Sequence, residues 1–271
     1  MNKRNRIIYI IFGVIFIGCF VSYAILSREQ KYDKIVYKIE YPSDTLFTEK
    51  EFDRYVSKNY PSIVGNPFDS VNLSILEKKI EKYPYISNAD VINNRGTLII
   101  KATQDKIIAK IFNNRNEQFF LAESGKLVPK TKNTAGRILV VNGAINRRYA
   151  VNYFVYKEDN TKNKSKFSTL NLVWRVAIFI EKDPFWKAQI SQIYVNDKQE
   201  LELIPTIGEH VVLFGNVNVD EEMDAVIKQR FDNLKHLYVE GFKITGWNKY
   251  TSINLKYGAE IPCKRKSNNP Q

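Results

Sequence analysis

Residues 73–103, LSILEKKIEKYPYISNADVINNRGTLIIKAT, decide the fold of the first folded segment of the chain. Apolar side chains recur at helical spacing in its first half, which predicts an amphipathic helix. The residues of this apolar stripe are Leu73, Leu76, Ile80 and Tyr83. Asn72 or Asp69 can cap the start of the helix, and Pro84 ends it.

A β-hairpin is predicted directly after this helix. Residues 86–92 and 97–103 have the composition of strands, and the turn sequence Asn93-Asn94-Arg95-Gly96 separates them. On the amino-terminal side, residues 34–41 alternate as a strand does, and Thr48-Glu49-Lys50-Glu51 is a capping box that starts another helix. Residues 34–105 therefore predict a domain with the element order β-α-α-β-β.

An uncharged apolar run, IIYIIFGVIFIGCFVSYAIL, precedes this domain at residues 7–26. A helix of this length spans about 30 Å, which is the thickness of the hydrocarbon core of a bilayer. We therefore expect a cytoplasmic tail over residues 1–6 and a single transmembrane helix over residues 7–26. The residues that anchor this helix in the membrane include Ile7, Phe12, Phe16, Phe20 and Leu26.

The basic cluster of Lys3, Arg4 and Arg6 favours an N-terminus inside the cell. This orientation predicts a single-pass protein of the cytoplasmic (inner) membrane, with the bulk of the chain outside the cytoplasm. Two alternatives stay open: Ser22-Tyr23-Ala24 is a small-x-small triplet of the kind that signal peptidase cuts, and Phe16-Ile17-Gly18-Cys19 loosely resembles a lipid-attachment box. A retained anchor is favoured because the run stays apolar beyond both sites.

Short strands dominate the rest of the chain, which predicts a β-rich domain over residues 106–261 and a basic tail over residues 262–271. The strand candidates are residues 107–112, 118–122, 138–142, 190–195, 200–204, 210–214 and 251–257. Helices are predicted over 167–182, ended by Asp183-Pro184, and over 220–238, while residues 157–166 (KEDNTKNKSK) form a polar loop. The fold class is therefore α+β with mostly antiparallel strands after the anchor.

Composition and motifs argue against most chemical functions. The net charge is +12 at pH 7, yet the densest basic run, Lys264-Arg265-Lys266, is better interpreted as a solvated tail than as a nucleic-acid patch. Cys19 and Cys263 lie in different regions, so neither a disulfide nor a cysteine metal site is expected. His210 and His236 are far apart, and no catalytic motif or glycine-rich phosphate loop is present. We expect no catalytic residue, cofactor, metal or small-molecule substrate.

Five segments, in their order and spacing, resemble the bacterial cell-division family FtsQ/DivIB over essentially the whole chain. The segments are residues 76–86 (LEKKIEKYPYI), 119–129 (FFLAESGKLVP), 183–186 (DPFW), 201–205 (LELIP) running to Phe214-Gly215, and 253–257 (INLKY). Outside the resemblance, the DPFW segment is explained by a buried aromatic helix terminus. The polar insertion at residues 157–166 departs from the family pattern.

The resemblance implies a POTRA domain over residues 34–105 and a second, β-rich domain behind one membrane helix. It further implies a non-enzymatic scaffold of the division septum, which binds FtsB and FtsL and so helps control septal peptidoglycan synthesis. The POTRA domain would contact other division proteins or the membrane surface, and its helix over residues 48–58 is a plausible face.

Partner binding is expected at the last strand, residues 251–257, because an open strand edge offers unpaired N–H and C=O groups to a partner strand. The candidate partner-binding residues are Thr251, Ile253, Leu255, Lys256 and Tyr257. By the resemblance, Lys256 meets an acidic partner residue, and Tyr257 contributes contact area and a hydroxyl. For Ile253 and Leu255, plain core packing is the favoured alternative.

Two other functions stay in view. A POTRA-containing adaptor in envelope protein assembly or secretion would usually carry further POTRA units or a membrane β-barrel, and only one such unit is recognised in this sequence. A membrane-anchored hydrolase would need a cluster of titratable residues, which the sequence does not offer. The scaffold is therefore the leading hypothesis.

Overall fold

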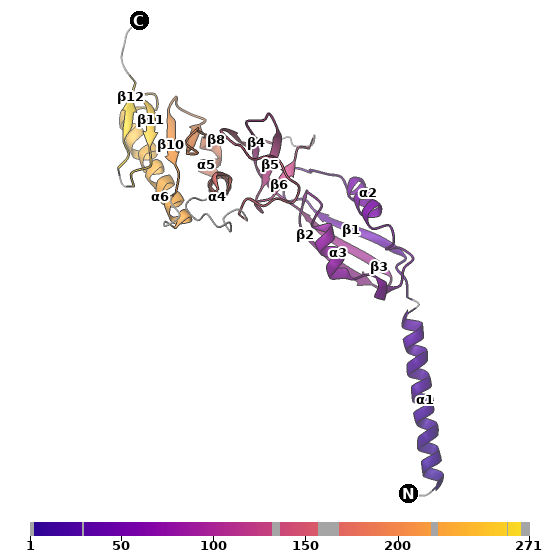
Figure 1. Ribbon diagram of the computed structural model, residues 1–271. Helices are drawn as coiled ribbons and strands as arrows, with labels where there is room; N and C mark the ends of the chain where they lie inside the picture. The colour runs from indigo at the N-terminus through magenta and orange to yellow at the C-terminus, as the bar shows by residue number, and fades with distance from the viewer. Residues whose placement is uncertain are drawn as a thin grey trace. The chain divides into compact units, whose positions relative to one another are not determined.

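The computed structural model describes residues 3–28, 30–131, 136–156, 168–217, 222–258 and 260–266. It divides into two compact units (Figure 1). Unit 1 comprises Met1–Tyr41 and Phe47–Gln104, and unit 2 comprises Pro42–Leu46 and Asp105–Gln271. The mixed α+β class is confirmed. The predicted polar loop at residues 157–166 lies outside the described residues.

The first helix, α1, spans Lys3–Arg28, so it begins within the basic cluster rather than at Ile7. Its described apolar side chains are exposed, with Phe12 and Phe16 at 69% and 74% of their full accessibility. Across the part of the chain that the structure describes, no helix combines the length and the apolar character needed to cross a membrane. The transmembrane helix stays a prediction.

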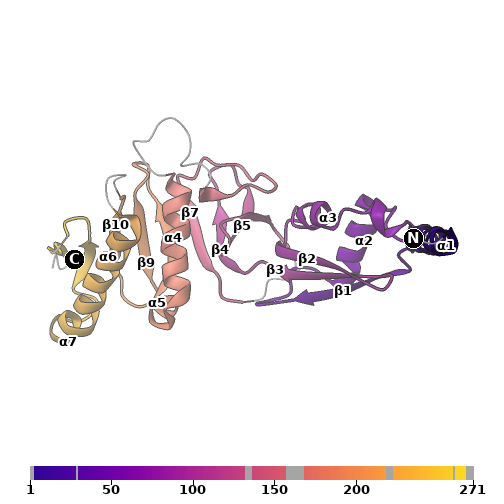
Figure 2. The same cartoon turned by 90° about the horizontal axis from the view of Figure 1, so that it is seen from below.

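Unit 1 has the predicted element order β-α-α-β-β. Its elements are β1 (Lys34–Glu40), α2 (Glu49–Asn59), the short 3-10 helix η1 (Phe68–Ser70), α3 (Leu73–Ile80), β2 (Ile86–Asn94) and β3 (Thr97–Gln104). The central strand β3 pairs in parallel with β1 and antiparallel with β2. Figure 2 shows both helices on the same side of this sheet.

Local signals in the sequence explain these elements. The hydroxyl of Thr48 accepts a hydrogen bond from the Glu51 N–H at 3.3 Å, and the Glu51 carboxylate accepts one from the Thr48 N–H at 2.8 Å. These bonds form the predicted capping box and lower the pKa of Glu51. Arg95 and Gly96 have positive φ angles of 48° and 88°, as a two-residue hairpin turn requires.

The core of unit 1 lies between the two helices and the sheet. Each helix places its apolar stripe inward, because side chains three and four residues apart lie on one face. The buried residues of this layer include Phe52, Val56, Leu76, Ile80, Leu98 and Ile100. Asn72, and not Asp69, caps α3, since its side chain accepts a hydrogen bond from the Ile75 N–H at 3.0 Å.

Unit 2 contains, within its described residues, a nine-stranded sheet in the order β12-β11-β10-β9-β8-β7-β4-β5-β6. The strands are β4 (Ile107–Phe112), β5 (Gln118–Ala122), β6 (Leu127–Pro129), β7 (Leu139–Gly143), β8 (Ile190–Val195), β9 (Leu201–Pro205), β10 (Val211–Gly215), β11 (Tyr250–Asn254) and β12 (Cys263–Arg265). Most neighbours are antiparallel, as predicted, but β7 runs parallel to β4 and β8, and β11 runs parallel to β10. The short strands β6 and β12 were not predicted.

The helices of unit 2 are α4 (Thr169–Lys182), α5 (Pro184–Gln189), α6 (Met223–His236), the π-helical turn η3 (Leu237–Gly241) and α7 (Phe242–Thr245). Figure 2 shows α4, α5 and α6 on the same side of the sheet. The predicted stop at Asp183-Pro184 ends α4, and it also starts α5, because the Asp183 carboxylate accepts a hydrogen bond from the Phe185 N–H at 2.8 Å. Trp186 of α5 is buried, as the aromatic-terminus interpretation expects.

The capping box yields a test of the fold of unit 1. Thr48→Ala removes the hydroxyl that caps α2, and such a change costs about 1 kcal/mol of stability. We expect the amide protons of α2 to exchange with solvent about fivefold faster in this variant. Ser57→Ala, on the exposed side of the same helix, is the matched control and should leave the rates unchanged or lower them. Equal exchange rates of the α2 amides in the two variants would contradict the assignment of Thr48 as the helix cap.

Candidate functional site

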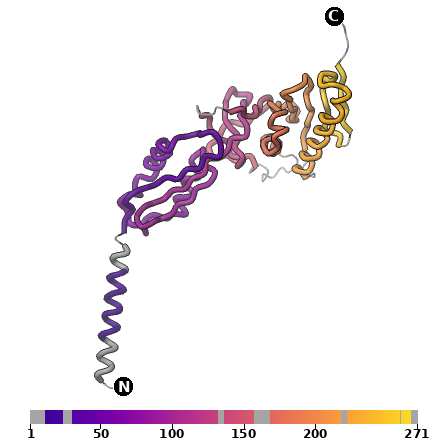
Figure 3. The backbone as a smooth tube through the Cα atoms, turned by 180° about the vertical axis from the view of Figure 1, so that it is seen from behind, coloured from indigo at the N-terminus to yellow at the C-terminus, as the bar shows by residue number. Residues whose placement is uncertain are grey.

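The end of the larger sheet holds the residues that the sequence pointed to for partner binding. β11 lies between β10 on one side and β12 on the other, and Figures 1 and 3 show α6 beside this end of the sheet. The Asn254 N–H donates to the Pro262 carbonyl at 2.9 Å, and the Lys266 N–H donates to the Lys249 carbonyl at 3.0 Å. Both edges of β11 are therefore paired.

The prediction that residues 251–257 form the last strand is wrong in two respects. The strand ends at Asn254, because the Asn254 side chain accepts a hydrogen bond from the Lys256 N–H at 3.1 Å and the chain then turns, with Gly258 at a φ of 64°. The chain also returns as β12, antiparallel to β11, with Cys263 opposite Ile253 and Lys264 opposite Ser252. Residues interpreted as a solvated tail thus form the edge strand at this end of the described sheet.

The five candidate residues have different surroundings. The Thr251 hydroxyl donates to the Lys264 carbonyl of β12 at 3.2 Å. Ile253 and Leu255 are buried in the core of unit 2, so the core-packing interpretation is confirmed for both. Lys256 forms an ion pair inside the chain. Of the five, Lys256 and Tyr257 are exposed residues, and Tyr257 is 63% exposed.

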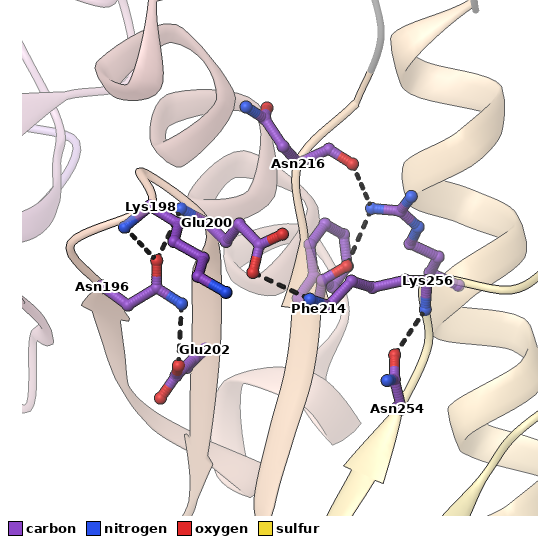
Figure 4. Close-up of polar contacts among 9 residues, drawn as sticks. Asn196, Lys198, Glu200, Glu202, Phe214, Asn216, Asn254 and Lys256 are labelled. Atoms are coloured by element: carbon purple, nitrogen blue, oxygen red, sulfur yellow. Dashed lines mark hydrogen bonds and ion pairs between the residues drawn. The ribbon is translucent and has the colours of Figure 1, made fainter.

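The ion pair of Lys256 joins two segments that are distant in the sequence. Its Nζ lies 2.8 Å from Oε2 of Glu200, which directly precedes β9 (Figure 4). The hydrogen bond and charge of Lys256 lower the pKa of Glu200, while partial burial acts in the opposite direction. Lys256 is therefore engaged within the chain, whereas the family resemblance implies contact with an acidic partner residue.

Gly215 makes room for this lysine. It ends β10 with a φ of 85°, and a Cβ at this position would lie 2.7 Å from Cγ of Lys256. The absent side chain lets the aliphatic stem of Lys256 pass directly over the backbone on its way to Glu200. Sequence reasoning did not assign Gly215 this role, although a glycine closing an apolar strand is a signal of close approach.

Arg230 is a buried cation that sequence reasoning missed. Its Nη1 donates to the carbonyl groups of Phe214 and Asn216, each at 2.8 Å, and only 8% of the residue is exposed. Its guanidinium also lies over the ring of Phe214 at 5.2 Å. The residue thus attaches α6 to the end of β10. The sequence offers no signal for it, because one arginine on a helix is most often solvated.

The buried titratable groups His210 and Tyr238, near this end of the sheet, are packed and hydrogen-bonded within unit 2. His210 precedes β10 and is buried, and its Nε2 lies 2.8 Å from the hydroxyl of Tyr238. Burial lowers the pKa of His210 and raises that of Tyr238. The rings of Phe242 and Trp247 pack around this pair. Among the described residues, no group of three His, Cys, Asp or Glu side chains could hold a metal ion.

Comparison with known proteins identifies a family for the larger unit. A family model described as FtsQ/DivIB, C-terminal related, matches residues 106–264, which is more than half of the chain and includes the end of the sheet described above. No curated protein matches the chain.

The Lys256–Glu200 pair yields a test of this geometry. In a double-mutant cycle of Lys256→Met and Glu200→Gln, we expect a coupling of about 0.5 kcal/mol in the free energy of unfolding at pH 7, since both side chains are partly exposed. The folded-state pKa of Glu200 is depressed, so this coupling is present above the unfolded pKa of about 4.3 and is lost as the pH falls through the folded value. Urea unfolding across this range measures it, and a coupling that does not fall as the pH is lowered from 7 would contradict the assignment of the ion pair.

Proposed function

The chain belongs to the FtsQ/DivIB family, and we propose that it is a membrane-anchored scaffold of the bacterial division complex. Family membership supports a role in cell division, and this family is one of non-enzymatic division scaffolds. The finer proposal is that the protein binds partners of the FtsB and FtsL type at the β11–β12 end of unit 2. Through these partners it helps control septal peptidoglycan synthesis.

The observation that carries the proposed binding site is the exposure of Tyr257 just beyond the end of β11. Its side chain is 63% exposed, while the neighbouring Leu255 is fully packed in the core. Large exposed aromatic side chains are characteristic of binding sites, because they contribute apolar area at little cost in conformational entropy. Leu255, two residues earlier in the chain, belongs to the core of unit 2 and fixes the start of this segment.

Strand addition is the binding mode that we propose for this site. A partner segment that takes the place of β12 beside β11 gains main-chain hydrogen bonds, and side chains such as Tyr257 then contribute specificity. The basic residues Lys264 and Arg265, which form no ion pair among the described residues, favour an acidic partner. Lys256 supports the backbone of the site through its contact with Glu200.

We propose membrane anchoring through α1, with the N-terminus inside the cell and the larger part of the chain outside the cytoplasm. The uncharged run at residues 7–26 and the exposure of its described apolar side chains support this arrangement. Confinement to the membrane raises the effective concentration of the scaffold for partners that are anchored in the same way. Unit 1 is proposed to be a POTRA domain that contacts other division proteins.

Depletion of the protein tests its role in division. We expect cells to grow as filaments without septa, and a fluorescent fusion of the full chain to collect at midcell. An adaptor in envelope assembly would instead give a uniform envelope signal. Normal septation after complete depletion, in a cell without a second copy of the gene, would contradict the proposal.

Tyr257→Lys tests the proposed binding site. We expect the affinity for the FtsB-type protein of the same cell to fall by about 30-fold, which is typical for the loss of an aromatic residue at the centre of an interface. Tyr194→Lys is the matched control, because Tyr194 is also partly exposed but lies on β8. Circular dichroism should show that both variants remain folded. Equal affinities of the two variants for the partner would exclude Tyr257 from the interface.

A further inference from the structure

The edge of β11 that faces away from β10 already holds a strand of the same chain. β12 pairs antiparallel with β11 there, and a strand edge can accept one neighbour at a time. We propose that β12 is a resident strand, which must leave β11 before a partner segment can pair with it. This inference rests on the proposed function for the place of binding, and it adds the step that controls access to this place.

Three features of β12 make it easier to displace than a long, regular strand. It has three residues, its register with β11 is irregular between Tyr250 and Ser252, and Pro262 before it has no N–H to donate. Lys264 and Arg265 are exposed and bury little apolar area. Short segments with few buried contacts open most readily. A longer partner strand would form more hydrogen bonds along β11 than β12 does.

β11 itself is held independently of β12. It pairs in parallel with β10, and the Leu255 N–H donates to the Leu213 carbonyl at 3.0 Å. Ile253 and Leu255 are buried in the core. We expect β12 to separate from the sheet beyond Gly258. The Gly258 carbonyl accepts a hydrogen bond from the Asn233 side chain of α6 at 2.6 Å, which holds the segment before it. Departure of β12 would therefore leave β11 and the Leu255–Tyr257 segment in place.

The resident strand also indicates what kind of segment fits. It runs antiparallel to β11 and places the small, partly buried Cys263 side chain opposite Ile253. A displacing segment should therefore be extended, antiparallel and longer than β12, with a small apolar residue opposite Ile253. The competition lowers the apparent affinity of any partner by the fraction of molecules in which β12 is open.

Two neighbouring amide groups of the full-length protein test whether β12 opens. The Asn254 N–H donates to Pro262 of β12, and the Leu255 N–H donates to Leu213 of β10. We expect the protection factor against hydrogen exchange to be at least about 100-fold lower at Asn254 than at Leu255. Equal protection at the two sites would overturn the proposal, because β12 would then open only when β11 does.

A disulfide lock identifies the opening segment. Ser252→Cys and Lys264→Cys lie opposite each other in the ladder, and Cys19→Ser and Cys263→Ala remove the native thiols. Oxidation of this variant should raise the protection of Asn254 to that of Leu255, and reduction should restore the difference. Protection that does not respond to the disulfide would overturn the assignment to β12.

A peptide tests whether the vacated edge accepts a strand. The probe is a synthetic peptide of residues 260–266 with Cys263→Ala. We expect the full chain carrying Lys264→Pro, which weakens the resident strand, to bind this probe at least about tenfold more tightly than the wild-type chain does. A peptide with Lys264→Pro is the matched control and should bind neither chain.

Equal binding of the probe by the folded variant and the wild-type chain would overturn the proposal. Circular dichroism checks the fold of the variant. If the variant does not fold, the hydrogen-exchange measurements at Asn254 and Leu255 of the wild-type chain decide whether β12 opens. None of these measurements involves cell division, so a failure of the resident-strand proposal is distinguishable from a failure of the proposed function.

Discussion

The parallel pairing of β10 with β11 is the constraint on which the carboxyl-terminal end of unit 2 depends. Parallel neighbours cannot be joined by a tight turn, so the chain leaves β10, passes along the sheet as α6 and then returns as β11. Arg230 attaches this crossover to two carbonyl groups at the end of β10, and Phe231 of the same helix packs against Phe179 and Trp186. The position of β11, and with it that of Tyr257, follows from these contacts.

The same arrangement creates a second edge on β11, which an exposed sheet must protect from unwanted pairing. The chain protects it with β12, whose residues Lys264 and Arg265 are exposed and charged. A short charged edge strand discourages association between copies, yet it is weak enough to be replaced by a longer segment. Protection against aggregation and selective access for a partner are therefore two consequences of one strand.

Sequence patterns predicted the elements whose causes are local. The capping box at Thr48 and Glu51, the turn at Arg95-Gly96 and several strands of unit 2 depend on residues that are close in the chain. β12 could not be predicted, because Cys263, Lys264 and Arg265 have no alternating apolar pattern. These residues form a strand only through their pairing with β11. The Lys256–Glu200 ion pair could not be predicted either. Its two residues are 56 positions apart, and no local pattern around one points to the other. Burial of Ile253 and Leu255 was foreseen as the core alternative.

The central claim of this account is that division partners meet the protein at the β11–β12 end of unit 2. Photocrosslinking in living cells tests it most directly, with a photoreactive phenylalanine analogue placed at Tyr257 in one strain and at Tyr194 in another. The account predicts a crosslink to an FtsB-type or FtsL-type protein from position 257 and none from position 194. A crosslink to these proteins from position 194 but not from position 257 would contradict it.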